Sequence, residues 1–177
     1  GKMMSTLPSL GFAGIGLMGL PMCQRLLAAG YPLTVWNRNP AKCAALVEAG
    51  ARQVATPAEL CQHAEVGMLC LGDSSVVREV VFGESGIAEG AKKGQLLVDF
   101  SSLEPTATRE MATELGKTGM GWLDAPVSGG VVGAEAGSLA IMVGGSAADL
   151  ERVKPVLQRL GQRVTHMGAV GAGQVTK

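Results

Sequence analysis

A glycine pattern that directly follows an apolar segment constrains the fold of this chain most strongly. Residues 10–13 are apolar, and Gly14, Gly16 and Gly19 then follow with the spacing G-x-G-x-x-G. In dinucleotide-binding units these glycines allow a tight turn, close approach of a pyrophosphate, and close packing of helix on strand. The free N–H groups at the helix start bind an anion without basic side chains. The predicted dinucleotide contacts are Gly14, Ile15, Gly16, Leu17, Met18 and Gly19, with packing of the first helix as the alternative for Met18.

The rest of the chain alternates between β-favouring and amphipathic helical segments. Strands are expected at residues 33–36, around Val54, and at 66–71, 95–100, 122–125, 139–143 and 163–166. Helices are expected at 20–27, 40–47, from the capping box 56–59 onward, at 74–82, from 105 through 115, and at 147–160. This alternation predicts an α/β fold with a Rossmann-like, doubly wound, mostly parallel sheet, covered by helices on both faces. Residues 1–177 are expected to form one dinucleotide-binding domain whose ligands bind at the carboxyl ends of the strands.

Charge and composition favour a small-molecule ligand. Fifteen basic and fifteen acidic residues give a formal net charge of zero. Such a balance offers neither the basic footprint of a nucleic-acid-binding protein nor a polybasic membrane surface. The sequence therefore predicts no nucleic-acid partner and no membrane partner.

The cysteines indicate neither a metal site nor a disulfide framework. Cys23, Cys43, Cys61 and Cys70 show no C-x-x-C spacing, and the two histidines lie far apart. These cysteines fall on predicted helices and one apolar strand, where they are expected to be buried as small hydrophobes, which suits a reducing cytoplasm. The apolar N-terminal stretch after Lys2 also resembles a signal peptide, but its glycines and Pro21 make a poor helix. We therefore expect a cytoplasmic protein with no metal ion.

The residues after the second expected strand bear on which dinucleotide binds. An NAD-binding unit usually carries an acidic residue here for the ribose 2′-hydroxyl, whereas this chain has Asn37 and Arg38. Asn37 can hydrogen-bond a ribose or phosphate oxygen, and Arg38 can pair with a 2′-phosphate. NADP is therefore predicted, with NAD as the second choice. An exposed turn with a solvated arginine is the alternative interpretation, and Arg25 and Lys42 are expected to be ordinary helix-surface charges.

Three further segments carry a family resemblance: Asp99–Ser102, Asp124–Gly130 and Gly171–Lys177. Together with the glycine turn they resemble the β-hydroxyacid dehydrogenases, which include 3-hydroxyisobutyrate dehydrogenases, tartronate semialdehyde reductases and glyoxylate or succinic semialdehyde reductases. The resemblance implies a Rossmann-like N-terminal domain followed by a helical domain that usually builds a homo-oligomer. This chain ends at the residue where that helical domain would begin.

The resemblance also implies roles for particular residues. Lys177 would be the general acid or base, and Ser128 would be catalytic and, with Gly129 and Gly130, would bind the substrate carboxylate. Leu71, Gly72 and Ser102 would contact the cofactor. Alternatives are an ordinary turn for residues 128–130, a helix cap formed by Ser101 and Ser102, and cap or turn roles for Asp73 and Asp124.

The predicted function is an NADP-dependent oxidoreductase that transfers hydride between the cofactor and a small hydroxyacid or semialdehyde. A non-catalytic NADP-binding or assembly module of the same fold is the alternative. A phosphosugar substrate, as in 6-phosphogluconate dehydrogenase, is a weaker choice because the histidine-rich approach to the lysine is missing. Imine reductases share the glycine turn and the Asn-Arg pair, yet typically lack this lysine in the same role.

Overall fold

A computed structural model of the chain describes residues 6–176. Its strands are β1 (Leu10–Ala13), β2 (Leu33–Trp36), β3 (Arg52–Gln53), β4 (Val66–Leu69), β5 (Leu96–Asp99), β6 (Gly121–Asp124), β7 (Val127–Ser128), β8 (Leu139–Gly144) and β9 (Gly161–Gly168). Its helices are α1 (Gly19–Ala28), η1 (Pro40–Cys43), α2 (Ala44–Glu48), α3 (Pro57–His63), α4 (Ser74–Phe82), α5 (Ile87–Gly90), α6 (Pro105–Gly116), α7 (Gly130–Ala136), α8 (Ala147–Gln158) and α9 (Ala172–Thr176). Across these residues no helix combines the length and apolar character needed to span a bilayer.

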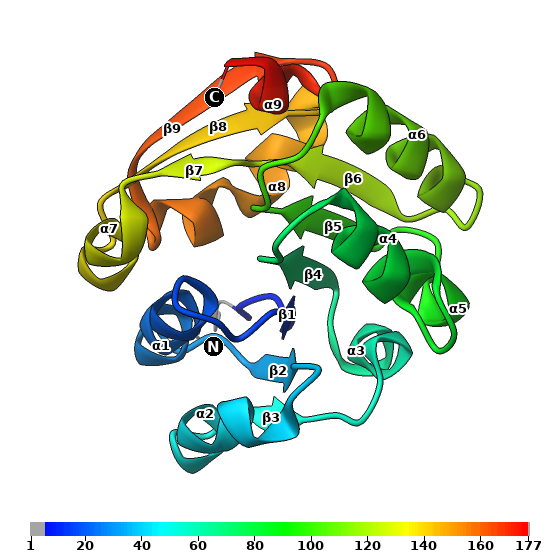
Figure 1. The fold of residues 1–177 in the computed structure, drawn as a ribbon. Coiled ribbons are helices and arrows are strands. Elements are labelled where there is room, and N and C mark those ends of the chain that lie inside the picture. The colour runs from blue at the N-terminus through cyan, green and yellow to red at the C-terminus, as the bar shows by residue number, and fades with distance from the viewer. Residues whose placement is uncertain (1–5, 177) are drawn as a thin grey trace, which may run out of the picture.

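The strands form one sheet in which parallel pairing dominates (Figure 1). Strands β3, β2, β1, β4, β5 and β6 lie side by side in parallel, and β8 then runs antiparallel to β6 and β7. Strand β9 pairs in parallel with the other side of β8. The chain moves outward from β1 to β3 and then returns to β4 on the opposite side of β1. The predicted doubly wound α/β fold is confirmed, and β1 marks the topological switch point.

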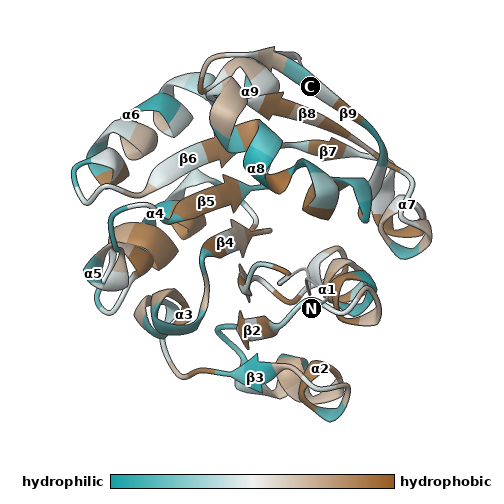
Figure 2. Ribbon diagram, turned by 180° about the vertical axis from the view of Figure 1, so that it is seen from behind, coloured by the Kyte–Doolittle hydropathy of each residue, from teal (hydrophilic) through white to brown (hydrophobic). Residues whose placement is uncertain are grey.

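Helices cover both faces of the sheet because successive strand residues point to opposite faces. One core cluster packs α1, α2, α7 and α8 against side chains such as Leu10, Phe12 and Val98, and a second packs α3, α4, α5 and α6 against Ala13 and Leu97. Figure 2 shows the hydrophobic colouring of β5 in the middle of the sheet and the polar colouring of β3 at one edge. The helices therefore bury the strands from both sides.

Several expected boundaries are corrected by the structure. The strand expected around Val54 ends at Gln53. In the helical segment expected at 40–47, Cys43, Leu46 and Val47 have the spacing of one buried face, but Val47 is exposed. In the helix expected at 20–27, Leu20, Cys23 and Leu27 have the spacing of one face, but the buried face of α1 is carried by Met22, Cys23 and Leu26. Short elements with little periodicity were not expected from the sequence: β7, α5, α7 and α9.

Arg25 is not the ordinary surface charge that the sequence indicated. Its Nε donates to the carbonyl oxygen of Arg159 at 2.9 Å, and its Nη1 donates to that of Glu135 at 3.2 Å. These carbonyls lie at the carboxyl ends of α8 and α7, where a cation is favourable. Arg25 thus ties α1 to two neighbouring helix ends.

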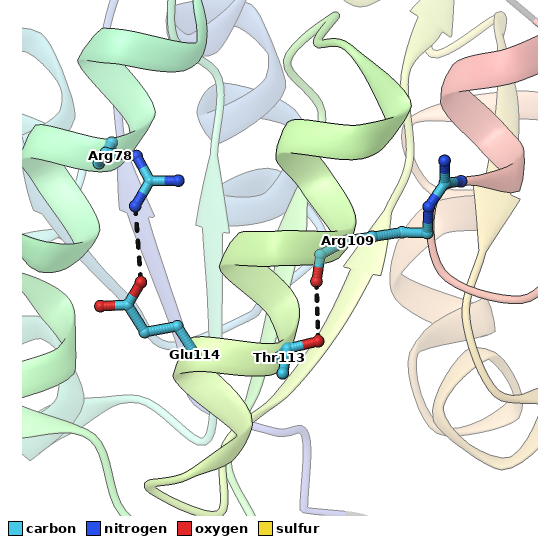
Figure 3. A network of polar contacts seen from close by, with 4 residues as sticks. All are labelled: Arg78, Arg109, Thr113 and Glu114. Atoms are coloured by element: carbon cyan, nitrogen blue, oxygen red, sulfur yellow. Dashed lines mark hydrogen bonds and ion pairs between the residues drawn. The ribbon is translucent and has the colours of Figure 1, made fainter.

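The outer face of α6 carries a second set of polar contacts (Figure 3). Arg78 pairs with Glu114 at 3.5 Å, and about half of each side chain is exposed. Such exposed pairs contribute little to stability. Arg109 points away from this pair, and a side chain built on Gly171 would meet its guanidinium, so Arg109 packs against the loop that precedes α9.

Candidate dinucleotide and substrate site

The carboxyl ends of the parallel strands lie side by side along one edge of the sheet, the edge that runs across the strand ends. The last residues of β2, β1 and β4 lie in register, with Trp36 opposite Ala13 and Ala13 opposite Leu69. The last residues of β5 and β6, Asp99 and Asp124, continue this row. The loops after these five strands carry most of the predicted site residues, so the fold brings those residues to one edge.

The glycine turn after β1 has the geometry that each glycine was predicted to supply. Gly14 has a φ of +105°, and a Cβ there would collide with the carbonyl oxygen of Cys70. A Cβ on Gly19 would collide with the carbonyl oxygen of Gly14, since α1 starts directly against the turn. A Cβ on Gly16 would meet no atom within 4 Å. The packing requires the first and third glycines, whereas the space above Gly16 is open.

The backbone at the tip of this turn offers donors to a ligand. Within residues 6–176 the N–H groups of Gly16, Leu17 and Met18 have no acceptor, and the N-terminus of α1 has no side-chain cap. Free N–H groups and the positive end of a helix dipole together form an anion site. Leu17, 81% exposed, stands beside this site. The residues present therefore fit a diphosphate.

Asn37 supports the turn from the end of β2. Its Oδ1 accepts a hydrogen bond from the N–H of Ile15 at 2.9 Å, and its Nδ2 donates to the carbonyl oxygen of Asn39 at 3.0 Å. The side chain of Ile15 lies in the core beneath the turn. Asn37 thus fixes the glycine turn, whereas the sequence predicted only a hydrogen bond to a ribose or phosphate oxygen of the ligand.

Arg38 lies next to a surface hollow at the same edge. The hollow is lined by Trp36, Asn37, Arg38, Pro40, Gln53, Val54 and Ala55. Arg38 is exposed, and no acidic side chain lines this hollow. An acidic residue at this place would repel a 2′-phosphate, whereas an exposed guanidinium can form charge-assisted hydrogen bonds with one.

The loops after β4 and β5 are joined by Ser101. The N–H of Leu71 donates to its Oγ at 2.9 Å, which holds Leu71 and the exposed Gly72 beside the β5 loop. Ser102 is exposed at the edge of the sheet. The N-cap position of α6 is occupied by Glu104, so the alternative interpretation of Ser101 and Ser102 as a cap of this helix is wrong.

Asp73 is the N-cap of α4, as expected. Its Oδ1 accepts from the Oγ of Ser75 at 2.7 Å and from the N–H of Val76 at 3.0 Å. These hydrogen bonds lower the pKa of the exposed Asp73 carboxyl. Asp73 therefore fixes the start of α4 directly after Gly72.

Asp99 is a fully buried carboxyl at the end of β5. Its Oδ1 accepts from the N–H of Ser101 at 2.9 Å, while its Oδ2 has no hydrogen-bond partner within the described part of the chain. Burial raises the pKa of Asp99 to about 7, the charge of Asp124 adds to this rise, and the hydrogen bonds from Ser101 oppose it. A carboxyl that changes charge near neutral pH therefore lies beneath the site.

Asp124 fixes the turn that leads into α9, instead of lying in a turn itself. It ends β6, where its Oδ1 accepts from the N–H of Gly171 at 2.7 Å and its Oδ2 from the N–H of Gln174 at 3.1 Å. A Cβ on Gly173 would lie 2.5 Å from the carbonyl oxygen of Met142, so α9 packs tightly on the sheet. Lys177, the predicted general acid or base, follows α9 and lies outside the described residues.

Ser128, Gly129 and Gly130 form an exposed segment between β7 and α7. Ser128 lies opposite Ala140 of β8, and Gly129 and Gly130 have φ values of +132° and +62°. Because L side chains rarely adopt such values, both positions favour glycine. The segment is accessible to a ligand, as the predicted substrate contact requires.

Two polar residues that hold this site together were not predicted from the sequence. Asp99 and Gln174 lie within the segments that carry the family resemblance, and both are buried and hydrogen-bonded to site loops. One signal was available: two apolar strands, 96–99 and 121–124, both end in aspartate. The position of Gln174 could not be inferred, because the two partners of its side chain are more than 70 residues away.

Comparison with known proteins places this arrangement in a family. The sequence profile described as the NAD binding domain of 6-phosphogluconate dehydrogenase matches residues 9–168. Among curated relatives, 2-hydroxy-3-oxopropionate reductase of Escherichia coli is 41% identical over 95% of this chain, and mitochondrial 3-hydroxyisobutyrate dehydrogenase of Mus musculus is 39% identical over 99%. The chain spans 57% and 52% of these proteins, about half of their length.

Solved structures agree with this assignment. A 3-hydroxyisobutyrate dehydrogenase of Mycobacterium tuberculosis with L-serine superposes with a TM-score of 0.90 at 34% identity, covering 97% of this chain and 58% of its own. Psf3 in complex with NADP+ and 2-OPP gives 0.90 at 30% identity, with coverages of 94% and 59%. An imine reductase variant of Myxococcus stipitatus in complex with NAD+ gives 0.88 at 27%, with coverages of 97% and 58%. The chain therefore belongs to the family of the NAD-binding domain of 6-phosphogluconate dehydrogenase, and its expected membership of the β-hydroxyacid dehydrogenases is confirmed.

Proposed function

We propose that this chain is the NADP-binding part of an oxidoreductase that interconverts a small hydroxyacid and its semialdehyde or keto form. The observation that carries the proposal is the glycine turn with its free N–H groups beside Arg38. We also propose that residues 1–177 act as one dinucleotide-binding domain. The names of the relatives support the hydroxyacid substrate class.

The cofactor contacts follow from the placement of the loops. The N–H groups of Gly16, Leu17 and Met18 hold the diphosphate, and Arg38 pairs with the 2′-phosphate. Asn37 contributes indirectly, because its Oδ1 already holds the N–H of Ile15. Leu71, Gly72 and Ser102 contact the nicotinamide half.

The chemistry assigns two roles to protein groups. The hydroxyl of Ser128 and the backbone N–H groups of Gly129 and Gly130 hold the substrate carboxylate. Lys177 gives a proton to the carbonyl oxygen as that oxygen becomes a hydroxyl, and takes it back in the reverse direction. When bound, NADPH supplies the hydride.

Cofactor selectivity is tested by calorimetric titration with NADPH and NADH at fixed ionic strength, because charged contacts are screened by salt. Wild type is expected to prefer NADPH. Arg38→Ala is expected to lower NADPH affinity about tenfold or more and to change NADH affinity less than threefold. Arg163→Ala, at an exposed position on the far strand β9, is the matched control and should change neither. A preference for NADH in wild type contradicts the NADP assignment.

Catalysis is tested by the absorbance of the reduced nicotinamide with small carboxylated aldehydes as substrates, using the complete protein that contains this chain. Lys177→Met should remove turnover while NADPH affinity stays within about threefold of wild type. Ser128→Ala should raise KM for the substrate more than it lowers kcat. Tight NADPH binding without oxidation of NADPH by any such aldehyde contradicts the enzymatic proposal.

A further inference from the structure

Gln174 joins three segments that are far apart in the sequence. Its Nε2 donates to the carbonyl oxygen of Ser101 at 2.7 Å, and its Oε1 accepts from the N–H of Leu103 at 2.9 Å. Its own N–H donates to Oδ2 of Asp124 at 3.1 Å. These contacts span 73, 71 and 50 residues of sequence. Gln174 therefore connects α9 with the loop after β5 through its buried side chain, and with the end of β6 through its backbone N–H.

The connection extends to the loop after β4. The carbonyl oxygen of Ser101 accepts a hydrogen bond from Gln174, and the Oγ of Ser101 accepts one from the N–H of Leu71. A continuous hydrogen-bonded path therefore runs from Asp124 through Gln174 and Ser101 to Leu71. Arg38 and the glycine turn lie outside this path, on the β2 side of the edge.

The side-chain amide nitrogen and oxygen of Gln174 hydrogen-bond two backbone groups that are buried away from water. The carbonyl of Ser101 and the N–H of Leu103 belong to a loop, and both hydrogen bonds are buried. Buried backbone groups require partners, and an apolar side chain at position 174 would leave one donor and one acceptor unsatisfied. Fully satisfied buried networks of this kind fix a single arrangement of the segments that they join.

We propose that Gln174 is a positioning residue for the nicotinamide end of the dinucleotide. It holds the loop 100–103, which presents Ser102, and the helix that leads to Lys177 as one unit. This inference rests on the proposed function, since it takes the nicotinamide half of the cofactor to bind beside these loops. It predicts that Gln174 matters for one half of the cofactor and not for the other.

The test compares a whole cofactor with its adenosine half. Gln174→Met keeps the length of the side chain but removes its donor and its acceptor. Calorimetry should show NADPH affinity lowered about fivefold or more. The affinity for 2′,5′-ADP, which reaches only the glycine turn and Arg38, should stay within about twofold of wild type. A general loss of structure would lower both.

Gln95 provides a matched control at the opposite end of β5, because it directly precedes the first residue of that strand. Its Nε2 donates to the carbonyl oxygens of Cys61 and Ala64 at 2.8 and 3.0 Å, and its Oε1 accepts from the N–H of Lys92 at 2.6 Å. Gln95→Met therefore removes the same kinds of hydrogen bond as Gln174→Met. It should leave the affinities for NADPH and for 2′,5′-ADP unchanged.

A second variant tests the same contact through pH. Gln174→Glu keeps an acceptor for the N–H of Leu103, but its ionised form places an oxygen against the carbonyl of Ser101. Protonation restores a donor at that position, so NADPH affinity, measured relative to wild type at each pH, should recover as the pH is lowered from about 8 to about 5.5. The deficit of Gln174→Met should not change over this range.

The outcomes separate this inference from the proposed function. If wild type binds neither NADPH nor 2′,5′-ADP, the proposed function fails and this inference fails with it. If wild type binds NADPH and Gln174→Met binds it within about twofold as well, only the positioning role is overturned. Equal losses for NADPH and 2′,5′-ADP in the folded variant also overturn it.

Discussion

The buried carboxyl of Asp99 should make the stability of this protein fall between mildly acidic and neutral pH. The pKa of this group is about 7 in the folded chain, against 3.8 for an ordinary aspartate. Between these two pKa values the folded state therefore keeps a proton on Asp99, whereas the unfolded chain has lost it. The stabilisation from Asp99 is fully present below the unfolded pKa and is lost as the pH rises through the folded one.

The size of this effect follows from the two pKa values. The difference between the two pKa values corresponds to a total loss of up to about 4 kcal/mol in the free energy of unfolding as the pH rises. About 2 kcal/mol of this loss falls between about pH 5.5 and pH 8. No solvent screening reduces the effect, because Asp99 is completely buried. The charged and titratable neighbours are Asp124, whose charge raises the pKa of Asp99, and Cys70, whose own pKa is raised by burial and further by Asp99.

The perturbation is Asp99→Asn, which removes the titrating group and keeps an acceptor for the N–H of Ser101. Urea unfolding is followed by the fluorescence of the buried Trp122 at several pH values. The difference in unfolding free energy between variant and wild type should move in favour of the variant by about 2 kcal/mol between about pH 5.5 and pH 8. Titrating groups that do not interact with Asp99 cancel in this difference.

Asp73→Asn is the matched control for this experiment. Hydrogen bonds from Ser75 and Val76 lower the pKa of the exposed Asp73, so its stabilisation is present above the unfolded pKa and is lost only as the pH falls through the lower, folded pKa. The curve of this variant should therefore run parallel to that of wild type above pH 5.5. A parallel curve for Asp99→Asn as well would refute the reasoning about the buried carboxyl.

Three further predictions follow from the packing. Gly19→Ala should lower the free energy of unfolding by about 2 kcal/mol or more in urea titrations, because its Cβ would collide with the carbonyl oxygen of Gly14. Arg25→Met should lower the free energy of unfolding by about 1 kcal/mol, because two helix ends lose a cationic donor. Lys42→Met, at an exposed position, should lower it by less than about 0.5 kcal/mol, and equal losses would contradict the role of Arg25. Burial raises the pKa of the Cys61 and Cys70 thiols to about 11 and about 12, so all four cysteines should react with a disulfide reagent at pH 8 at least about tenfold more slowly in the folded chain than in urea.

The sequence predicted the elements whose periodicity is imposed by a buried face. Helix α4 has the expected bounds, and Met111 and Leu115, whose spacing in the sequence is that of one helical face, are both buried in α6. The glycine turn was predictable because steric rules tie each glycine to one function of the turn. Strand β7 and helix α9 escaped prediction, since their positions depend on pairing with β8 and on bonds to Asp124, which no local pattern shows.

The polar residues of the site were harder to interpret than the glycines. Asn37 was expected to face the ligand, yet its Oδ1 holds the N–H of Ile15, a contact between residues 22 apart. In the sequence Arg25 looks like an ordinary charge on a helix surface. Only the tertiary fold places the carbonyl oxygens of Glu135 and Arg159 next to it. Side-chain hydrogen bonds to distant backbone groups follow from tertiary structure and are invisible in a single sequence.

The most direct test of the account is the affinity of Gly16→Ala for NADPH. A Cβ at this position meets no protein atom within 4 Å, so the free energy of unfolding should stay within about 0.5 kcal/mol of the wild-type value. The same methyl group would stand where the diphosphate approaches the turn, so calorimetry should show an affinity at least about tenfold weaker than that of wild type. A stable Gly16→Ala variant that binds NADPH as tightly as wild type would contradict the assignment of the glycine turn as the dinucleotide site.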